Sequence, residues 1–314
     1  MTGQSDRLNI CFCFTDESGE YYKNPLTAMS SIFENTRDPV RVHLICDETV
    51  DPEHRDIFTV LGGRYGQEII FYHIPPVPQA VLGNTRSIFG KGTLFRLFIP
   101  ELIHEERVLY LDCDVICTMD VRAVFDLPTG SVPMAGAPDT GLRGDRKLSL
   151  YLRSLGLDPK SYVNAGVLLM DLEKIRHGYA ELKDRTLSFI AEKRGLRSPD
   201  QDALNKYFQS RNINICVLPE NCNYLLGNGD NAYRTLPEYT GKILHYTGEK
   251  PWKTLYPAAL VYWKYYARVF SCDDVFSAIE KLSMPEYAYL QSFVLQKPKV
   301  RRWLNRVYEI SEYG

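Results

Sequence analysis

The sequence predicts an α/β fold in which helices cover both faces of a doubly wound, mostly parallel sheet, followed by a helical C-terminal extension. Three observations lead to this prediction. Short apolar runs that resemble buried strands alternate with segments of helical spacing. Several of these runs end in an aspartate or a turn sequence, as strands do at the ligand-binding edge of such sheets. The length of 314 residues suits one large α/β domain with an appendage.

Apolar or alternating runs predict strands, in chain order, over residues 9–15, 40–46, 68–74, 108–111, 134–138, 163–172 and 242–246. Helical spacing predicts helices over residues 26–33, 52–61, 94–102, 172–194 and 200–208. We expect Gly62-Gly63 to close the second of these helices and Ser198 to cap the last. Because strands and helices alternate, the sheet should be parallel over most of its width.

The expected division places a catalytic domain in residues 1–255 and the helical extension in residues 256–314. The formal net charge of -2 gives no positive field of the kind that nucleic-acid binding requires. The eight cysteines form no CxxC pair, and several lie inside strand-like runs, which indicates a reducing, cytosolic compartment. We expect no signal peptide and no membrane span, since no apolar run reaches about 18 residues.

The strongest chemical signal is Arg-Val-Leu-Tyr-Leu-Asp-Cys-Asp-Val-Ile-Cys, residues 107–117. An apolar strand runs directly into Asp112 and Asp114. Burying unpaired carboxylates is costly, but at the carboxyl end of a strand they face the ligand crevice instead. Two hard oxygen ligands there suit Mg²⁺ or Mn²⁺, which hold phosphates. A surface turn with two solvated acids is the alternative.

Two further polar segments lie at expected strand ends. Asp16 ends the first strand, where its carboxylate could accept a hydrogen bond from a base or ribose, or simply cap the next helix. Asn164 offers a donor and an acceptor to a sugar hydroxyl. The small Ala165-Gly166 pair beside it permits close backbone approach to a ligand, or only packs in a strand bulge.

Two more segments carry candidate site residues. Asp200 and Gln201 stand in the first turn of a helix, where they point off its end or merely cap it. His245 closes an apolar strand and could join two carboxylates on one metal ion, or be a satisfied core histidine. Gly248 allows backbone N–H groups to approach a phosphate, and Lys250 supplies a cation for it.

Together and in this order, these segments resemble glycosyltransferase family 8, which contains bacterial lipopolysaccharide galactosyl- and glucosyltransferases and glycogenin. The matching residues are Phe14-Thr15-Asp16, Arg96, Leu109 to Asp114, Asn164 to Val167, Asp200 to Asn205, and His245 with Gly248 to Trp252. The resemblance implies a GT-A fold and a UDP-hexose donor carrying galactose or glucose. It also implies Mn²⁺, with Mg²⁺ as the alternative, and retention of the anomeric configuration.

The resemblance also implies a role for each matching residue. The metal ligands would be Asp112, Asp114 and His245. The diphosphate would be held by Gly248 and Lys250, and the uracil by Asp16. The donor sugar and reaction centre would be served by Arg96, Asn164, Ala165, Asp200 and Gln201. Cys113 belongs to the donor-binding segment but should not ligate the metal. Members of the family often carry an aromatic close behind the Asp16 position, whereas here four residues precede Tyr21.

Retention through a covalent intermediate would need a carboxylate nucleophile. Gln201 at the matching position is a poor nucleophile, which favours attack by the acceptor on the face from which the diphosphate leaves. Asp200 or Asp139 acting as nucleophile is the alternative. The expected partners are a UDP-sugar and a glycan or lipid-linked oligosaccharide acceptor, and no nucleic acid.

Two other functions compete with this one. In a haloacid-dehalogenase-type phosphatase the Asp-x-Asp motif normally ends the first strand, but here about three strands precede it. A non-catalytic sugar-nucleotide- or carbohydrate-binding protein should lack a metal ligand or the lysine, and neither is missing.

Residues 296–308 interleave five basic residues with apolar ones. A helix there could lie on the inner face of the plasma membrane, or dock on the domain.

Overall fold

The computed structural model describes residues 7–84, 90–142, 145–213, 215–227 and 229–280. The chain folds into two compact units, and segments of the two units alternate along the sequence. Unit 1 comprises residues 1–22, 38–113 and 122–223, and unit 2 comprises residues 23–37, 114–121 and 224–314. The expected domain boundary at residue 255 stays a prediction. The segment 296–308, expected to contact a membrane, lies outside the described residues.

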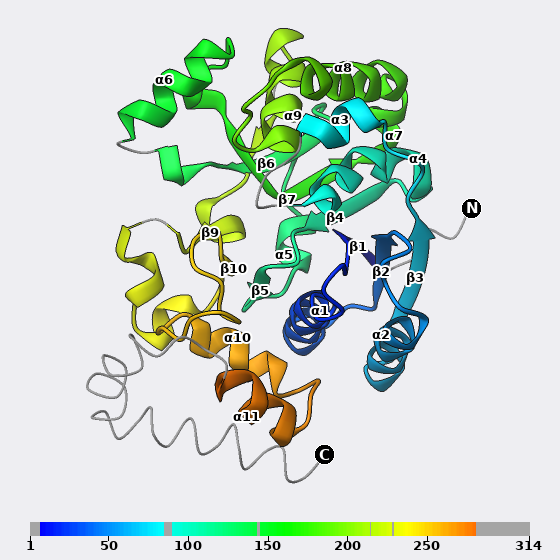
Figure 1. Ribbon diagram of the computed structural model, residues 1–314, viewed down its shortest axis with the longest axis vertical. Coiled ribbons are helices and arrows are strands. Elements are labelled where there is room, and N and C mark those ends of the chain that lie inside the picture. The colour runs from blue at the N-terminus through cyan, green and yellow to red at the C-terminus, as the bar shows by residue number, and fades with distance from the viewer. Residues whose placement is uncertain (1–6, 85–89, 143–144, 214, 228, 281–314) are drawn as a thin grey trace. The chain divides into compact units, whose positions relative to one another are not determined.

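Unit 1 is built on a seven-stranded sheet of order β3-β2-β1-β4-β7-β6-β8 (Figure 1). Its strands are β1 Leu8–Phe14, β2 Val40–Cys46, β3 Glu68–His73, β4 Arg107–Leu111, β6 Met134–Pro138, β7 Val163–Asp171 and β8 Cys216–Val217. Every pairing is parallel except those of β7, which runs antiparallel to both β4 and β6. The predicted mostly parallel sheet is therefore confirmed, with one reversed strand.

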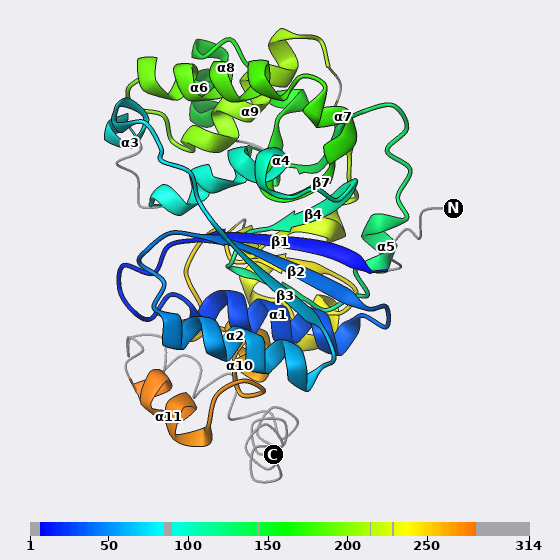
Figure 2. The ribbon, with the colours of Figure 1, turned by 90° about the vertical axis from the view of Figure 1, so that its right-hand side faces the viewer.

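Helices cover both faces of this sheet, as predicted (Figure 2). One face carries α2, and the other carries α3, α4, α7, α8 and α9. The alternation of side chains along β1 explains the two cores. Phe14 points to α2, where its ring centroid lies 5.7 Å from that of Phe58. Cys11 and Cys13 belong instead to the core beneath the opposite helices.

The helices of unit 1 are α2 Pro52–Arg64, α3 Gln79–Asn84, α4 Ile99–Leu102, α5 Arg122–Phe125, α6 Arg146–Ser154, α7 Leu172–Arg176, α8 Tyr179–Glu192 and α9 Pro199–Ser210. The 3₁₀ segments of this unit are η1 Lys91–Phe98, η2 Thr140–Leu142, η3 Pro159–Ser161 and η4 Glu220–Asn223.

Several predicted helix boundaries are wrong for identifiable reasons. The helix expected to close at Gly62-Gly63 continues to Arg64, because Gly62 lies against β3: a Cβ atom there would sit 2.5 Å from Ile69 Cγ1. The left-handed glycine follows the helix, at Gly66 with φ +67°. The single helix expected over 94–102 is η1 followed by α4, and the one expected over 172–194 is broken at Gly178 into α7 and α8.

Unit 2 contains a three-stranded sheet of order β5-β10-β9, formed by β5 Val115–Cys117, β10 Ile243–His245 and β9 Tyr224–Leu225. The strand expected over 242–246 is thus real but lies in this second sheet, which was not predicted. The remaining elements are α1 Lys23–Asn35, η5 Gly229–Tyr233, η6 Leu236–Tyr239, α10 Ala259–Tyr266 and α11 Cys272–Glu280. The core of this unit is rich in tyrosine. Among the residues that the structure describes, no helix has both the length and the apolar character needed to cross a membrane.

Candidate active site

The reversed strand β7 sets up the site in unit 1. Because β7 is antiparallel to β4, Leu111 at the end of β4 lies opposite Val167, and the beginning of β7 lies at the edge where β4 ends. The backbone N–H of Asp112 donates to the carbonyl of Gly166 at 2.8 Å. The predicted site residues Asn164 and Ala165 therefore lie beside Asp112, although the two segments are about fifty residues apart along the chain.

Arg96, from η1, is the centre of this group. Its guanidinium donates to the carbonyl of Ala165 and to Asp112 Oδ1 at 2.8 Å, and its Nε lies 3.0 Å from Asp200 Oδ2. Burial alone would lower the pKa of Arg96, but the two carboxylates hold that pKa above its ordinary value. Burial raises the pKa of Asp200, against the effect of Arg96. Arg96 thus stays charged while it is only 3% exposed.

Gln201 and Asp139 form the second part of the group. The Nε2 of Gln201 donates to Asp139 Oδ2 at 2.9 Å, and its Oε1 accepts the backbone N–H of Ala165 at 2.9 Å. Asn164 Nδ2 lies 3.3 Å from the same oxygen of Asp139, and its Oδ1 accepts from Gly166 N and from Asn223 Nδ2. The side chains of Asn164 and Gln201 are therefore each held in one orientation by hydrogen-bond partners on both sides.

The N-terminal turn of α9 does more than cap a helix. Ser198 is the N-cap residue, as predicted, but its side chain makes no capping hydrogen bond. Asp202 instead accepts the hydroxyls of Tyr151 at 2.5 Å and Tyr162 at 2.6 Å, and the Tyr162 hydroxyl also accepts from Gln201 Nε2 at 3.2 Å. The merely capping role considered for this turn is wrong, since Asp200 and Gln201 both make long-range contacts.

Sequence reasoning assigned no role to four residues that hold this network in place. They are Tyr110, Tyr162, Asp202 and Asn223. Tyr110 carried a usable signal, because it lies on β4 two residues before Asp112, which directly follows the strand, and two such positions should face the same side. Its hydroxyl donates to Asp112 Oδ1 at 2.5 Å, and its ring lies under Arg96 at 4.6 Å.

Unit 2 carries the remaining titratable residues of the predicted site, which are Asp114, His245 and Lys250. His245 lies opposite Val115 in the β10–β5 pairing, which brings its ring next to Asp114. The Nε2 of His245 is 3.3 Å from Asp114 Oδ1, and Lys250 Nζ is 2.5 Å from Asp114 Oδ2. Burial would raise the pKa of Asp114, but Lys250 and His245 hold that pKa far below its ordinary range. Asp114 is consequently ionised throughout the physiological pH range.

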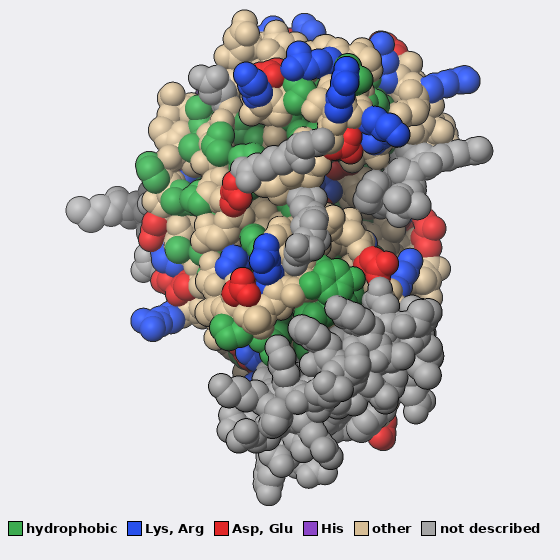
Figure 3. All heavy atoms as spheres, turned by 90° about the vertical axis from the view of Figure 1, so that its left-hand side faces the viewer, with side chains coloured by type: hydrophobic (Ala, Val, Ile, Leu, Met, Phe, Trp, Pro, Cys, Tyr) green, Lys and Arg blue, Asp and Glu red, His purple; other side chains and the backbone are tan. Residues whose placement is uncertain are grey.

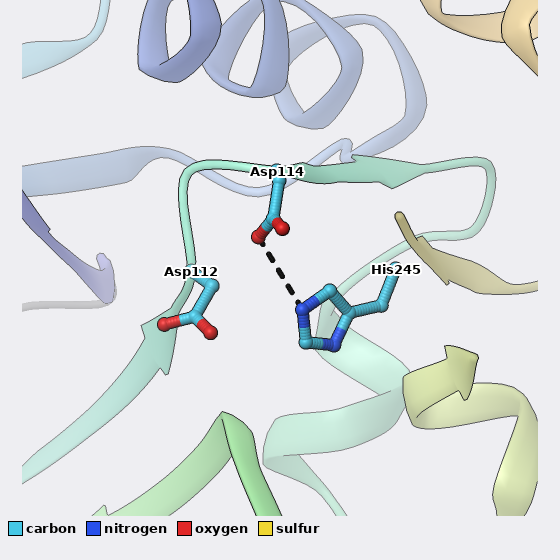
Figure 4. A group of neighbouring side chains, drawn as sticks. All are labelled: Asp112, Asp114 and His245. Atoms are coloured by element: carbon cyan, nitrogen blue, oxygen red, sulfur yellow. Dashed lines mark ion pairs between the residues drawn. The ribbon is translucent and has the colours of Figure 1, made fainter. Parts of the chain in front are cut away.

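Asp112, Asp114 and His245 form a group that could hold a metal ion (Figure 4). One ligand atom from each residue lies within 4.8 Å of the other two. Figure 4 shows the two carboxylates and the imidazole directed toward a common space. Two carboxylates and one imidazole are a donor set that a divalent cation such as Mn²⁺ accepts.

Gly248 is required for a reason that the sequence did not suggest. A Cβ atom on Gly248 would lie 2.8 Å from the Cα of Gly227, and a Cβ on Gly227 would lie 2.7 Å from the backbone nitrogen of Gly248. Both backbones in this contact belong to unit 2. The glycine therefore permits one loop of the protein to lie directly on another, and its contact with a phosphate stays a prediction.

Asp16 lies in a separate hydrogen-bonded group of unit 1. Its Oδ1 accepts the backbone N–H of Tyr21 at 2.6 Å, and its Oδ2 lies 3.2 Å from His54 Nδ1. These contacts place Asp16 in the turn that precedes the helix α1, while the uracil contact stays a prediction. Cys113 is buried, and its thiol lies 3.6 Å from the carbonyl oxygen of Cys13.

Comparison with known sequences identifies the family. The sequence profile described as Glycosyl transferase family 8 matches residues 9–255, which is most of the chain. The chain belongs to glycosyltransferase family 8. This membership agrees with the resemblance seen in the ordered motifs, and it removes the support for a haloacid-dehalogenase-type phosphatase.

Two relatives of the chain are named as lipopolysaccharide glycosyltransferases. A lipopolysaccharide 1,2-glucosyltransferase of Escherichia coli is 28% identical over 56% of this chain, and a lipopolysaccharide 1,3-galactosyltransferase of Salmonella typhimurium is 28% identical over 54% of it. The matches cover 54% and 49% of those enzymes, so the chain spans about half the length of these relatives.

Solved structures of glycosyltransferases share the fold. The galactosyltransferase LgtC, in complex with donor and acceptor sugar analogs, superimposes with a TM-score of 0.61 and 20% identity over 89% of this chain and 98% of its own. GlyE of Streptococcus pneumoniae gives a TM-score of 0.63 and 22% identity over 90% of this chain and 66% of its own. At such low sequence identity these similarities establish the fold alone. The structural match confirms the expected GT-A architecture.

Proposed function

We propose that this family 8 protein transfers a hexose, galactose or glucose, from a UDP-sugar to a glycan or lipid-linked acceptor, with retention of the anomeric configuration and with Mn²⁺ as cofactor. The observation that carries the proposal is the group of Asp112, Asp114 and His245, whose ligand atoms lie within 4.8 Å of one another. A non-catalytic binding protein would have no need of such a group. We further propose that the reaction takes place in the cytoplasm, at or near the membrane that carries a lipid-linked acceptor.

The residues of the group fit a divalent cation. The low pKa of Asp114 makes it an anionic ligand at any physiological pH. Asp112 and Asp114 would supply oxygen ligands and His245 a nitrogen, and Mg²⁺ would be the weaker occupant because imidazole favours transition metals. A bound ion would offset the negative charge that grows on the departing diphosphate. Lys250, now paired with Asp114, would hold a diphosphate oxygen by the same charge attraction.

The contacts of the candidate nucleophiles favour attack from the face of the leaving group. Asp200 is bound in an ion pair to Arg96, and Asp139 accepts hydrogen bonds from Asn164, Gln201 and Gly141 N. Either carboxylate would have to abandon these partners to reach an anomeric carbon. Gln201 cannot form a stable glycosyl ester, so its fixed amide would instead orient the donor sugar. The acceptor would then attack directly, and the leaving phosphate would take its proton.

The test is hydrolysis and transfer with UDP-galactose, UDP-glucose and UDP-N-acetylhexosamines in the presence of Mn²⁺. One of the two hexose donors should be turned over, and EDTA should stop the reaction. Asp114→Asn and His245→Ala should each reduce turnover by at least ~10³-fold, because each removes a metal ligand. Asp38→Asn, which removes a surface carboxylate paired with Arg122, is the matched control and should be fully active.

Three results would contradict parts of the proposal. Full activity in EDTA would exclude the metal, and turnover of none of these UDP-sugars would exclude the donor class. A glycosyl adduct on Asp200 or Asp139, found by mass spectrometry of the denatured enzyme during turnover, would replace direct attack by a covalent mechanism.

A further inference from the structure

The inference begins with the cations on the surface of unit 1. Some surface arginines and lysines of this unit are paired with carboxylates, such as Lys183 with Glu101 and Arg185 with Glu181. Within the residues of this unit that the structure describes, seven exposed cations have no ion pair: Arg146, Lys147, Arg153, Lys160, Lys193, Arg194 and Arg197. Figure 3 shows Lys and Arg side chains gathered at the top of the molecule, over the part of unit 1 that carries α6.

Six of these cations lie on two neighbouring segments, α6 and the loop 193–197, and we call the common surface of these six the basic patch. Tyr151 of α6 joins the segments: its hydroxyl accepts the backbone N–H of Arg197 at 2.9 Å, and the Arg197 guanidinium lies over its ring at 5.2 Å. Residues 145–154 and 192–197 together contain six cationic and two acidic side chains, although the whole chain carries a net charge of -2. One of the two acids, Asp145, is used to cap α6.

The helix presents one apolar side chain among these cations. Leu152 packs inward with Leu142, Leu157 and Tyr162. Leu150 faces outward and is 57% exposed, whereas few large apolar side chains of the described residues are exposed at all. Arg146, Leu150 and Arg153 are spaced by four and three residues, so they form one outward stripe on the helix. A single exposed leucine is ordinary, but here it stands between two unpaired arginines.

We propose that the basic patch docks the protein on an anionic phospholipid surface. The unpaired cations would face lipid phosphates, and Leu150 would enter the boundary between headgroups and acyl chains. A free polyanion, such as a phosphorylated glycan, would bind the cations but would offer no apolar region to receive the leucine side chain. The inference rests on the charges and the exposed leucine alone, and it does not depend on the proposed transfer reaction.

The experiment measures sedimentation of the full chain with vesicles of two parts phosphatidylcholine to one part phosphatidylglycerol. Each cation near an anionic surface contributes about a fivefold factor, so Arg146→Gln/Arg153→Gln should lower the partition coefficient about 25-fold. The matched control Arg37→Gln/Arg234→Gln removes two exposed cations outside the patch and should bind within about twofold of the wild type. Leu150→Ser should lower binding at least about threefold, and vesicles of phosphatidylcholine alone should bind none of the proteins.

Equal binding by the patch variant and its control would overturn the proposal. So would binding to a phosphorylated polysaccharide but not to the vesicles, with no effect of Leu150→Ser, since the partner would then be a glycan. If the α6 variant shows a lowered unfolding temperature, Lys193→Gln/Arg194→Gln answers the same question from outside any helix. Vesicle binding needs no turnover, so a protein that hydrolyses no UDP-hexose still tests this inference separately.

Discussion

Gln201→Glu is the most direct test of the reaction centre, because the wild-type amide donates its hydrogen to Asp139 Oδ2 at 2.9 Å. The substitution places two carboxylates at that distance. At an effective dielectric constant of about 20, two unit charges so close repel by about 6 kcal/mol, an upper figure because Asp139 is partly exposed. The folded variant avoids most of this cost by keeping one proton on the pair, which raises the pKa of the pair.

The sign of the pH dependence follows from that proton. The unfolded chain releases this proton near pH 4, whereas the folded variant retains it to a higher pH because the neighbouring carboxylate disfavours a second negative charge. Because the pKa of the carboxyl pair is higher in the folded variant than in the unfolded chain, the folded variant loses stability as the pH rises. The free energy of unfolding of Gln201→Glu, relative to the wild type, should therefore fall by about 1.4 kcal/mol per pH unit between about pH 5 and 7. Urea unfolding across this range measures it.

The matched control is Gln201→Glu/Asp139→Asn, in which the asparagine amide can donate to the new glutamate. This double variant should recover most of the lost stability and should show no steep dependence on pH. A loss that is equal at every pH, or one that Asp139→Asn does not relieve, would refute the contact on which the reasoning stands. Neither variant should transfer sugar faster than the wild type, since the reaction we propose needs no carboxylate there.

Three further predictions concern the charged residues and the tail. Arg96→Met should cost about 3–5 kcal/mol in urea unfolding, because it leaves the buried Asp200 and the partly buried Asp112 without their cation; an equally stable variant would contradict the ion pairs. Lys250→Met should lower stability at neutral pH, and the difference from wild type should shrink below about pH 4, where Asp114 loses its stabilising effect; a constant difference would argue against the depressed pKa. Deleting residues 296–314 should weaken vesicle binding and slow transfer to a lipid-linked acceptor, but leave hydrolysis of a soluble UDP-sugar unchanged, whereas an unfolded product would make that segment structural.

The candidate site was predictable to the extent that its residues occur as ordered motifs. Arg96, Asp112, Asn164 and Gln201 all enter one network in unit 1. What the sequence could not predict is the direction of β7. An apolar strand carries no signal of its direction, and the alternation with helices suggested a parallel one. In a parallel strand Asn164 would stand at the edge opposite to Asp112, so the reversal is what brings the two together.

The parts that escaped prediction are short or depend on distant contacts. The strands β8 and β9 have two residues each, too few for any periodicity to show. The sheet of unit 2 joins segments more than a hundred residues apart, such as β5 and β10. The helix α2 runs past Gly62 because of its packing on β3, a tertiary contact that overrides local propensity.

The contact between Gly227 and Gly248 limits how this protein can be altered, in the laboratory or in evolution. A clash between two side chains can be relieved by shortening one of them, so most packing defects have a compensating second mutation. Here each partner is already the smallest residue, and the atoms in contact are backbone. No substitution elsewhere can make room for a side chain at either position without moving a loop. A library built to change donor preference should vary the neighbours of Lys250 and leave these two glycines fixed.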